Sequence, residues 1–208
     1  MFDLDGVLVD STGVVERGWR RWALEAGIAA ADVLAVAHGR PSREVIAQFA
    51  PHLDATEEAN RLEEGEIEDP EGVAVLPGAS ECVALATQAR WAVVTSAGTQ
   101  LARSRMEAVG LPLPPVLITA DDVTRGKPDP EPYERASRSL GVHAADCLVI
   151  EDAPSGIAAA RAAGMTVVAV ATTYGAEALR DAGAVLPSMC DVYECLRAHP
   201  VEGAQGVP

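Results

Sequence analysis

The feature that most constrains the fold of this chain is a regular alternation of short apolar runs with longer helical stretches. The apolar runs are rich in Val and Ile and are apolar on both sides, which is typical of strands buried on both faces of a parallel sheet. The predicted strands are Phe2–Leu4, Trp91–Thr95, Val116–Thr119, Cys147–Ile150, Thr166–Val170 and Ala184–Leu186.

Alanine-rich stretches with helical character lie between these strands. The predicted helices are Gly78–Gln88, Thr99–Val109, Pro130–Leu140, Ser155–Ala163 and Ala176–Ala182. Several are followed by a glycine suited to a left-handed helix end, namely Gly110, Gly141, Gly164 and Gly183. Strand and helix in repeated alternation predict an α/β fold with right-handed crossovers, a Rossmann-like doubly wound parallel sheet.

The interval between the first and second strands is helical only, from residue 11 to about residue 76. Three helices are predicted there: one with Val15, Trp19 and Trp22 on its core face and Gly27 at its end, then Ser42–Phe49 and Thr56–Ile67. A block of this length is too large for a simple crossover, so we interpret it as an inserted all-helical cap.

The boundaries follow from this interpretation. The cap spans 12–76, the core comprises 1–11 and 77–198, and hinges lie near Asp10–Thr12 and Leu76–Gly78. The small and polar residues 199–208 are expected to form a flexible tail. The first strand has no residues before it, so we expect either that the numbering begins late or that the native chain extends upstream of Met1.

Composition excludes several classes of partner. A net charge of -15 argues against nucleic acid and against an anionic membrane surface, since both need clustered positive charge. No apolar run approaches the length of a membrane span, and the acidic first ten residues do not resemble a secretory signal. The four cysteines lack paired spacing, which predicts reduced thiols in a cytoplasmic protein. We expect the protein to be a monomer or a weak dimer.

Acidic and hydroxyl residues follow the predicted strands directly. Asp3 and Asp5 end the first strand, Thr95 and Ser96 follow the second, and Glu151 and Asp152 follow the fourth. In an open α/β sheet the ligand binds outside the carboxyl ends of the strands, so we expect these side chains to meet at one edge.

Lysine usage points to the same edge. The chain has 16 basic residues, of which only Lys127 is a lysine, and it lies in the loop after the third strand. An ammonium and a guanidinium are not interchangeable, so a lone lysine in an arginine-rich chain suggests a specific role.

A group of carboxylates without histidine favours Mg²⁺, because clustered acids repel one another unless a cation lies among them. A carboxylate such as Asp3 can attack a phosphoryl group and form an aspartyl phosphate. Lys127, the Thr95 hydroxyl and the backbone amides after Asp3, beginning with Leu4, could neutralise and position the phosphoryl oxygens. Asp5 could protonate the leaving alkoxide and then deprotonate water. The alternative is a purely structural role: Asp3 and Asp5 could be turn residues, and Thr95 and Ser96 could cap a helix.

Four stretches together resemble the motifs of the haloacid dehalogenase-like phosphohydrolases. They are FDLDGVLVDS, VVTSAG, GKPDP and VIEDAPSGIAAARAAG, in the family's order over residues 2–164. The resemblance implies that Asp3 is the nucleophile and Asp5 the general acid/base, and that Thr95 and Lys127, with neighbouring Ser96 and Leu4, bind phosphate. It also implies that Asp152 binds Mg²⁺ together with Asp3 and the Asp5 carbonyl, and that Glu151 does so directly or through water.

The insertion point resembles that of the family's first class of helical cap. The stretches HG, IAQFAP, GEI and TADDV are similar to those of glycerol-3-phosphatases and 2-deoxyglucose-6-phosphatases. The resemblance implies a phosphatase acting on a small phosphorylated sugar or polyol, with His38, Arg40 and Arg43 as candidate substrate contacts. A sugar phosphomutase of the β-phosphoglucomutase type, and a non-catalytic sugar-phosphate-binding protein, remain the alternatives.

Overall fold

The computed structural model describes residues 1–37 and 40–198. Its helices are α1 (Thr12–Ala26), α2 (Ala30–Ala37), α3 (Ser42–Phe49), α4 (Ala55–Glu68), α5 (Ala79–Ala86), α6 (Thr99–Ala108), α7 (Glu131–Leu140), α8 (Pro154–Ala162) and α9 (Met189–Ala198). Its strands are β1 (Val9–Asp10), β2 (Ala74–Val75), β3 (Ala92–Val94), β4 (Val116–Ile118), β5 (Leu148–Glu151), β6 (Thr166–Val170) and β7 (Ala184–Leu186). Short 3₁₀ turns lie at Ala120–Asp122 and Ala144–Asp146.

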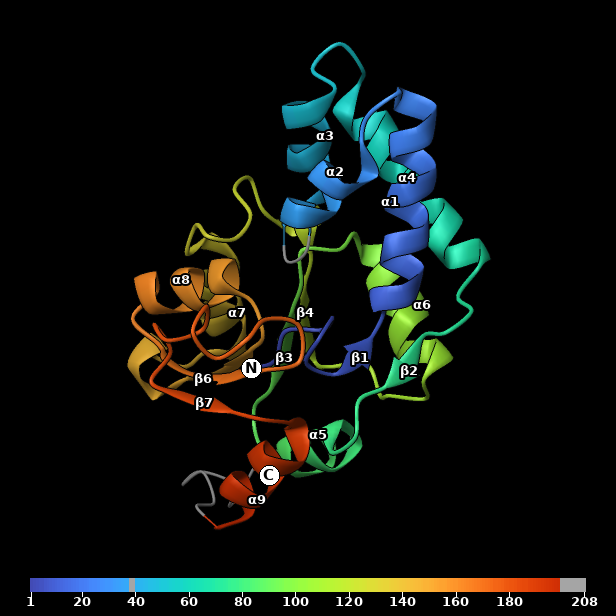
Figure 1. Cartoon of the computed structure of the whole chain (residues 1–208). Coiled ribbons are helices and arrows are strands. Elements are labelled where there is room, and N and C mark those ends of the chain that lie inside the picture. The colour runs from blue at the N-terminus through green and yellow to red at the C-terminus, as the bar shows by residue number, and fades with distance from the viewer. Residues whose placement is uncertain (38–39, 199–208) are drawn as a thin grey trace.

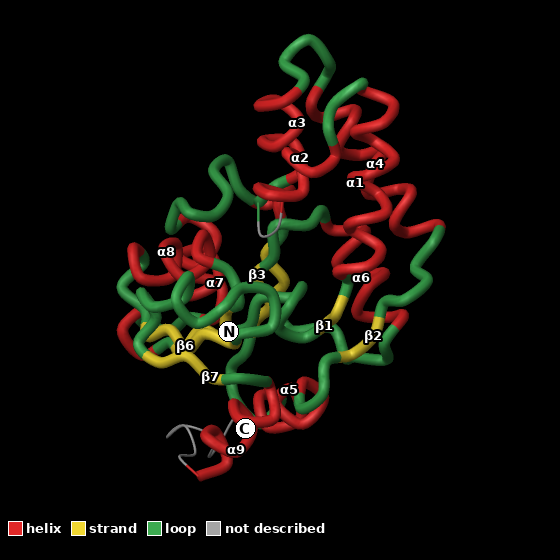
Figure 2. Tube along the Cα trace, in the orientation of Figure 1, coloured by secondary structure: helices red, strands yellow, loops and turns green. Residues whose placement is uncertain are grey.

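A parallel sheet forms the centre of the molecule. Strand β3 pairs with β4, and β5 pairs with β6, which pairs with β7 (Figure 1). The N-terminal segment joins the two halves, because Phe2 bridges in parallel to both Val93 and Ile150. The expected first strand, Phe2–Leu4, is therefore reduced to a bridge at Phe2, and the chain turns at Gly6 immediately afterwards. Figure 2 shows how short all the strand segments are.

Successive residues of the strands point into different hydrophobic clusters. Val93 and Ile150 belong to one cluster with residues of α5, α6 and α9. Their neighbours Val94 and Val149 belong to a second cluster with residues of α7 and α8. Side chains alternate between the faces of a strand, so helices cover the sheet on both sides and its strands are apolar throughout.

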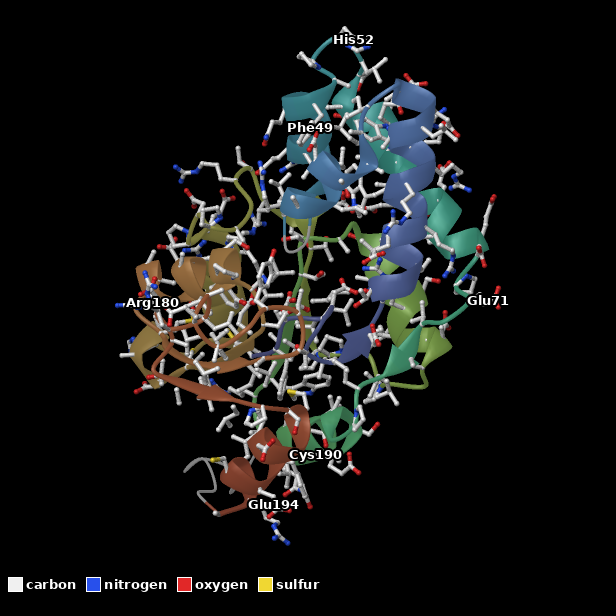
Figure 3. All side chains as sticks on the ribbon, viewed as in Figure 1. Phe49, His52, Glu71, Arg180, Cys190 and Glu194 are labelled. Atoms are coloured by element: carbon white, nitrogen blue, oxygen red, sulfur yellow. The ribbon has the colours of Figure 1, made fainter. Side chains whose placement is uncertain are left out.

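Helices α1 to α4 form a separate bundle above the sheet (Figure 1). Their apolar faces make a third cluster, in which the rings of Trp19 and Trp22 meet edge to face at 5.5 Å. The two segments that connect this bundle to the sheet lie side by side, because β1 and β2 pair in antiparallel fashion. His52 lies at the end of the bundle remote from the sheet, and Cys190 lies on α9 at the opposite end of the molecule (Figure 3).

The predicted α/β architecture with a helical insert is confirmed in most of its elements. The prediction of a helix at Ala176–Ala182 is wrong. This stretch forms consecutive turns, with hydrogen bonds such as that from Ala182 N–H to the Leu179 carbonyl. Gly183 therefore ends no helix, whereas Gly110, Gly141 and Gly164 have positive φ just after theirs. Helices α2 and α9 and the β1–β2 pair were not predicted. The expected tail, 199–208, lies outside the described residues.

Two expectations from composition can also be compared with the structure. Among residues 1–37 and 40–198, no helix is both long enough and apolar enough to cross a bilayer. The thiols of Cys82, Cys147 and Cys190 take part in no disulfide, as expected.

Candidate active site

A cavity of about 90 Å³ lies between the helical bundle and the carboxyl ends of the sheet strands. From the sheet side it is lined by Asp3, Asp5, Gly6, Thr95, Ser96, Ala97, Leu101, Arg105, Lys127, Glu151, Asp152, Ala153 and Thr173. From the side of the bundle and its connection it is lined by Ser11, Thr12, Val15, Trp19, Ala37, Arg40, Ser42, Glu63 and Glu66. The structure therefore brings together most of the residues that the sequence singled out at the strand ends.

Lys127 lines this cavity and is almost completely buried. Its ammonium group donates to Asp3 Oδ1 at 2.7 Å, to Glu151 Oε1 at 2.6 Å and to the Val94 carbonyl at 3.0 Å. Burial lowers the pKa of Lys127, but the neighbouring carboxylates outweigh it and hold that pKa well above its usual value. The side chain is a fixed positive charge beside Asp3.

Glu151 is fully buried and contacts Lys127. Besides Lys127, it accepts hydrogen bonds from the Tyr133 hydroxyl at 2.9 Å and from the backbone amides of Asp152 and Ala153 at 2.9 and 3.1 Å. A Cβ on Gly156 would lie 1.6 Å from Glu151 Oε1, so only glycine fits there. Both oxygens of Glu151 thus already have protein donors, which suits a residue that positions Lys127.

Asp152 packs against the turn that follows Asp3. A Cβ on Gly6 would lie 1.9 Å from Asp152 Oδ2, and Gly6 has φ of +79°. Glycine is therefore required here both for the backbone conformation and for the close approach of the carboxylate.

The donor set fits a hard divalent cation. Carboxylate oxygens of Asp3, Glu151 and Asp152 lie within 4.8 Å of one another, with Lys127 as the nearby positive charge. Burial raises the pKa of Asp3 to about 7 even against Lys127, and burial with Glu151 and Asp3 nearby raises that of Asp152 well above its usual value. Negative charge is thus in excess, and a cation held by oxygen ligands would relieve it.

Asp5 is the second carboxylate of the first loop, and two donors hold it. Its Oδ1 accepts a hydrogen bond from the Ser11 hydroxyl at 2.7 Å, and its Oδ2 pairs with Arg105 Nη1 at 2.7 Å. Arg105 was not singled out from the sequence, yet it is buried beside a candidate catalytic residue.

The residues expected to bind phosphate differ in their exposure to the cavity. Thr95 and Ser96 both line it, and Thr95 Oγ1 also accepts from the Ala97 amide at 3.1 Å. Leu4 is fully buried, and its carbonyl accepts from the amides of Leu8 and Val9 at 2.8 and 3.0 Å. Leu4 is not among the described residues that line the cavity.

The candidate substrate contacts on the bundle give a mixed result. Arg40 lines the cavity and donates to Gln48 Oε1 at 3.0 Å. Arg43 is not among the described lining residues, and His38 lies outside the described part of the chain.

The bundle instead contributes two carboxylates that sequence reasoning missed. Glu63 accepts from the Gly98 amide at 3.1 and 3.2 Å, and Glu66 pairs with Arg105 Nη2. A signal for Arg105 was present, since it shares the buried stripe of α6 with Leu101, Ala102 and Met106. Glu66 likewise shares a buried stripe of α4 with Ala59 and Leu62. A charged residue on an apolar stripe indicates a buried ion pair.

The molecule is thus an α/β protein whose parallel sheet is covered by helices on both faces, with clustered acids and a buried lysine at the carboxyl ends of its strands. The sequence model of the haloacid dehalogenase-like hydrolases matches residues 1–164. The chain belongs to this family.

Related proteins cover nearly the whole chain. It is 40% identical over 194 residues to hexitol phosphatase A of Escherichia coli, covering 91% of this chain and 90% of the relative. It is 35% identical over 204 residues to glycerol-1-phosphate phosphohydrolase 2 of Saccharomyces cerevisiae, covering 92% and 79%. A crystal structure of a hydrolase from Pseudomonas syringae superposes with a TM-score of 0.81 at 28% identity, covering 95% and 97% of the two chains.

Proposed function

We propose that the protein is a Mg²⁺-dependent phosphatase that hydrolyses small sugar or polyol monophosphates through an aspartyl-phosphate intermediate on Asp3. The observation that carries the proposal is the contact between Asp3 and Lys127, which lie 2.7 Å apart and line the same cavity as Asp5. The relatives named as hexitol and glycerol-1-phosphate phosphatases support the substrate class.

In the first half-reaction the second carboxylate oxygen of Asp3 attacks phosphorus and the bond to the ester oxygen breaks. Asp5 gives its proton to the departing alkoxide, which leaves as the free alcohol. Lys127 and the Thr95 hydroxyl stabilise the negative charge on the phosphoryl oxygens, while Glu151 and the Val94 carbonyl hold the Lys127 ammonium in place.

In the second half-reaction a water attacks the phosphorus of the aspartyl phosphate. Asp5, now ionised, takes the proton from that water, and the bond between phosphorus and Asp3 breaks. Inorganic phosphate leaves and Asp3 is regenerated. The pair with Arg105 at 2.7 Å and the hydrogen bond from Ser11 at 2.7 Å keep the Asp5 carboxylate in a fixed orientation.

Asp3 and Asp152, together with the Asp5 carbonyl, are the groups that would hold Mg²⁺ directly. Both oxygens of Glu151 already accept hydrogen bonds from protein donors. When bound, the ion would neutralise phosphoryl charge and lower the repulsion between substrate and carboxylates. Glu151 would then support the site indirectly, through Lys127 and the Asp152 amide.

The helical bundle completes the site from above. Trp19, Ala37, Arg40, Glu63 and Glu66 line the cavity opposite the strand ends. We assign this bundle, 12–76, as a cap that selects the alcohol part of the substrate and keeps water out during transfer to Asp3. A cytoplasmic location is part of the proposal, as expected for a chain whose cysteines were predicted to stay reduced.

A phosphate-release screen with Mg²⁺ tests the function. The panel contains hexitol 6-phosphates, glycerol 1-phosphate, 2-deoxyglucose 6-phosphate and nucleoside monophosphates. We expect release of inorganic phosphate from the polyol and sugar esters, and much slower release from nucleotides. Absence of release from every ester, or phosphate retained on an isomerised sugar in the presence of a bisphosphate primer, would contradict the proposal. The latter result would identify a phosphomutase.

A further inference from the structure

A buried arginine connects the candidate acid/base to the cap. Arg105 lies on α6, is only 5% exposed, and is flanked by the apolar residues Leu101, Ala102 and Met106. A guanidinium is costly to bury without partners, and its planar fork can hold two carboxylates at once. Here Nη1 pairs with Asp5, and Nη2 pairs with Glu66 of the cap helix α4.

We propose that Arg105 is a positioning residue that orients the Asp5 carboxylate and makes this orientation depend on the seating of α4 through Glu66. The inference rests on the proposed function, since it assigns a role to Arg105 in proton transfer by Asp5.

The contacts of Asp5 support the first part of this inference. One oxygen accepts from Ser11, which precedes α1 where the chain enters the cap, and the other pairs with Arg105. Both oxygens are thus fixed, one from the connection to the cap and one from α6. A general acid/base must lie within hydrogen-bond reach of the proton it transfers, so the orientation of its carboxylate limits the rate.

The contacts of α4 support the second part. Glu63 and Glu66 lie one turn apart on α4, and both face α6. Glu63 accepts from the Gly98 amide at the start of α6, and Glu66 reaches Arg105 farther along the same helix. A movement of α4 away from α6 would break the Glu66 pair and free the guanidinium that holds Asp5.

The charges around Arg105 favour a persistent link between Asp5 and Glu66 of α4. Burial by itself lowers the pKa of Arg105, but Asp5 and Glu66 raise it above its ordinary value, so the guanidinium stays charged. Among the described residues, its Nε is buried without a hydrogen-bond partner, so the side chain is held by its two terminal nitrogens. Loss of either carboxylate leaves the Arg105 guanidinium in only one of its two ion pairs.

Two substrates with different leaving groups distinguish a positioning role of Arg105 from general damage to the site. A hexitol phosphate must lose an alkoxide, which needs a proton from Asp5, whereas p-nitrophenyl phosphate loses a stable phenolate without one. We expect Arg105→Met to lower kcat/KM for the hexitol ester by about 10²-fold and to leave kcat/KM for p-nitrophenyl phosphate within about threefold. Arg105→Lys should recover part of the loss, and Glu66→Gln should cause a smaller loss of the same selective kind.

Two further measurements complete the test. Arg103→Met, an exposed arginine on the same helix, is the matched control and should leave both substrates unaffected. In the Asp5→Asn background, Arg105→Met should cause no further loss. Equal losses for both substrates, or losses that multiply with Asp5→Asn, would show that Arg105 has only a structural role.

Thermal unfolding tests the link without reference to activity. When Arg105 is present, the Tm shift of the Asp5→Asn, Glu66→Gln double variant should differ from the sum of the two single shifts by about 2–4 °C. In the Arg105→Met background the two single shifts should add. Additive shifts in both backgrounds would overturn the coupling even in an active phosphatase. If the wild-type protein releases no phosphate from any ester, the proposed function fails, and this cycle still decides whether Arg105 joins Asp5 to the cap.

Discussion

The Lys127 ammonium lies 2.7 Å from the Asp3 carboxylate, although 124 residues separate them in the chain. The remaining two donor positions of the ammonium are directed to Glu151 and to the Val94 carbonyl. Three protons thus meet three acceptors, which lie directly after the Phe2 bridge and at the carboxyl ends of β3 and β5. This arrangement fixes a positive charge beside the proposed nucleophile without any freedom to rotate away.

Replacement of Lys127 by arginine should therefore be poorly tolerated. A guanidinium is planar and larger, so it cannot direct three donors to these acceptors within a site that leaves Lys127 only 3% exposed. We expect kcat/KM to fall by about 10²–10³-fold, the scale for loss of a donor to developing phosphoryl charge. The measurement is steady-state phosphate release at saturating Mg²⁺.

The reciprocal exchange Arg125→Lys is the control for Lys127→Arg. The Arg125 side chain is 72% exposed and pairs with Asp129 at the surface, so its exchange should leave turnover unaffected. Normal turnover in Lys127→Arg would remove the argument that a compact ammonium is needed here.

Asp3→Asn should abolish turnover while the fold survives. An amide oxygen can still accept from Lys127, so the site keeps its shape, but an amide cannot form the acyl phosphate. We expect kcat to fall by more than about 10³-fold, with no phosphorylated protein trapped by rapid acid quench. Asp181→Asn, at an exposed turn, is the control. Near wild-type turnover in Asp3→Asn would refute the assignment of the nucleophile.

Much of this site was predictable because its residues lie at strand ends. Asp3, Thr95 and Asp152 each follow a short apolar run, and parallel strands bring such positions to one edge whatever the details of packing. Lys127 was identifiable as the single lysine of the chain. Sequence order and strand periodicity are local signals, and they determine these positions.

The pair between Arg105 and Glu66 was not predictable in the same way. Each residue lies on a buried stripe of its own helix, but 39 residues separate them, and their contact depends on how α4 packs on α6.

The prediction of a helix at Ala176–Ala182 was wrong for a different reason. Its composition favours a helix, but seven residues form an isolated helix poorly, and here the buried Leu179 anchors turns instead.

Removal of divalent cations should silence the enzyme and change its stability. Asp3 and Asp152 have raised pKa values mainly because they are buried, so a cation that relieves their charge should stabilise the fold. We expect EDTA to abolish phosphate release, and added Mg²⁺ to restore it and to raise Tm. The rise in Tm should disappear in Asp152→Asn and persist in Asp181→Asn. Turnover unaffected by EDTA would exclude a metal role.

Glu63 should make the stability of the protein depend on pH between about 4.5 and 7. Burial raises its pKa to about 7, more than the hydrogen bond from Gly98 lowers it, whereas the unfolded value is near 4.5. Because the folded state binds this proton more tightly than the unfolded state, the contribution of Glu63 to the free energy of unfolding is most favourable below pH 4.5. It is lost as pH rises towards 7, by on the order of 1–3 kcal/mol.

Glu63→Gln keeps an acceptor for the Gly98 amide and removes the titration. The free energy of unfolding, measured with urea at several pH values, should therefore fall less steeply from pH 5 to pH 7 in this variant than in the wild type. By pH 8 the variant should be the more stable of the two. Glu64→Gln, its exposed neighbour on α4, should follow the wild-type curve. A constant difference between Glu63→Gln and wild type across this range would show that Glu63 does not bind a proton on folding.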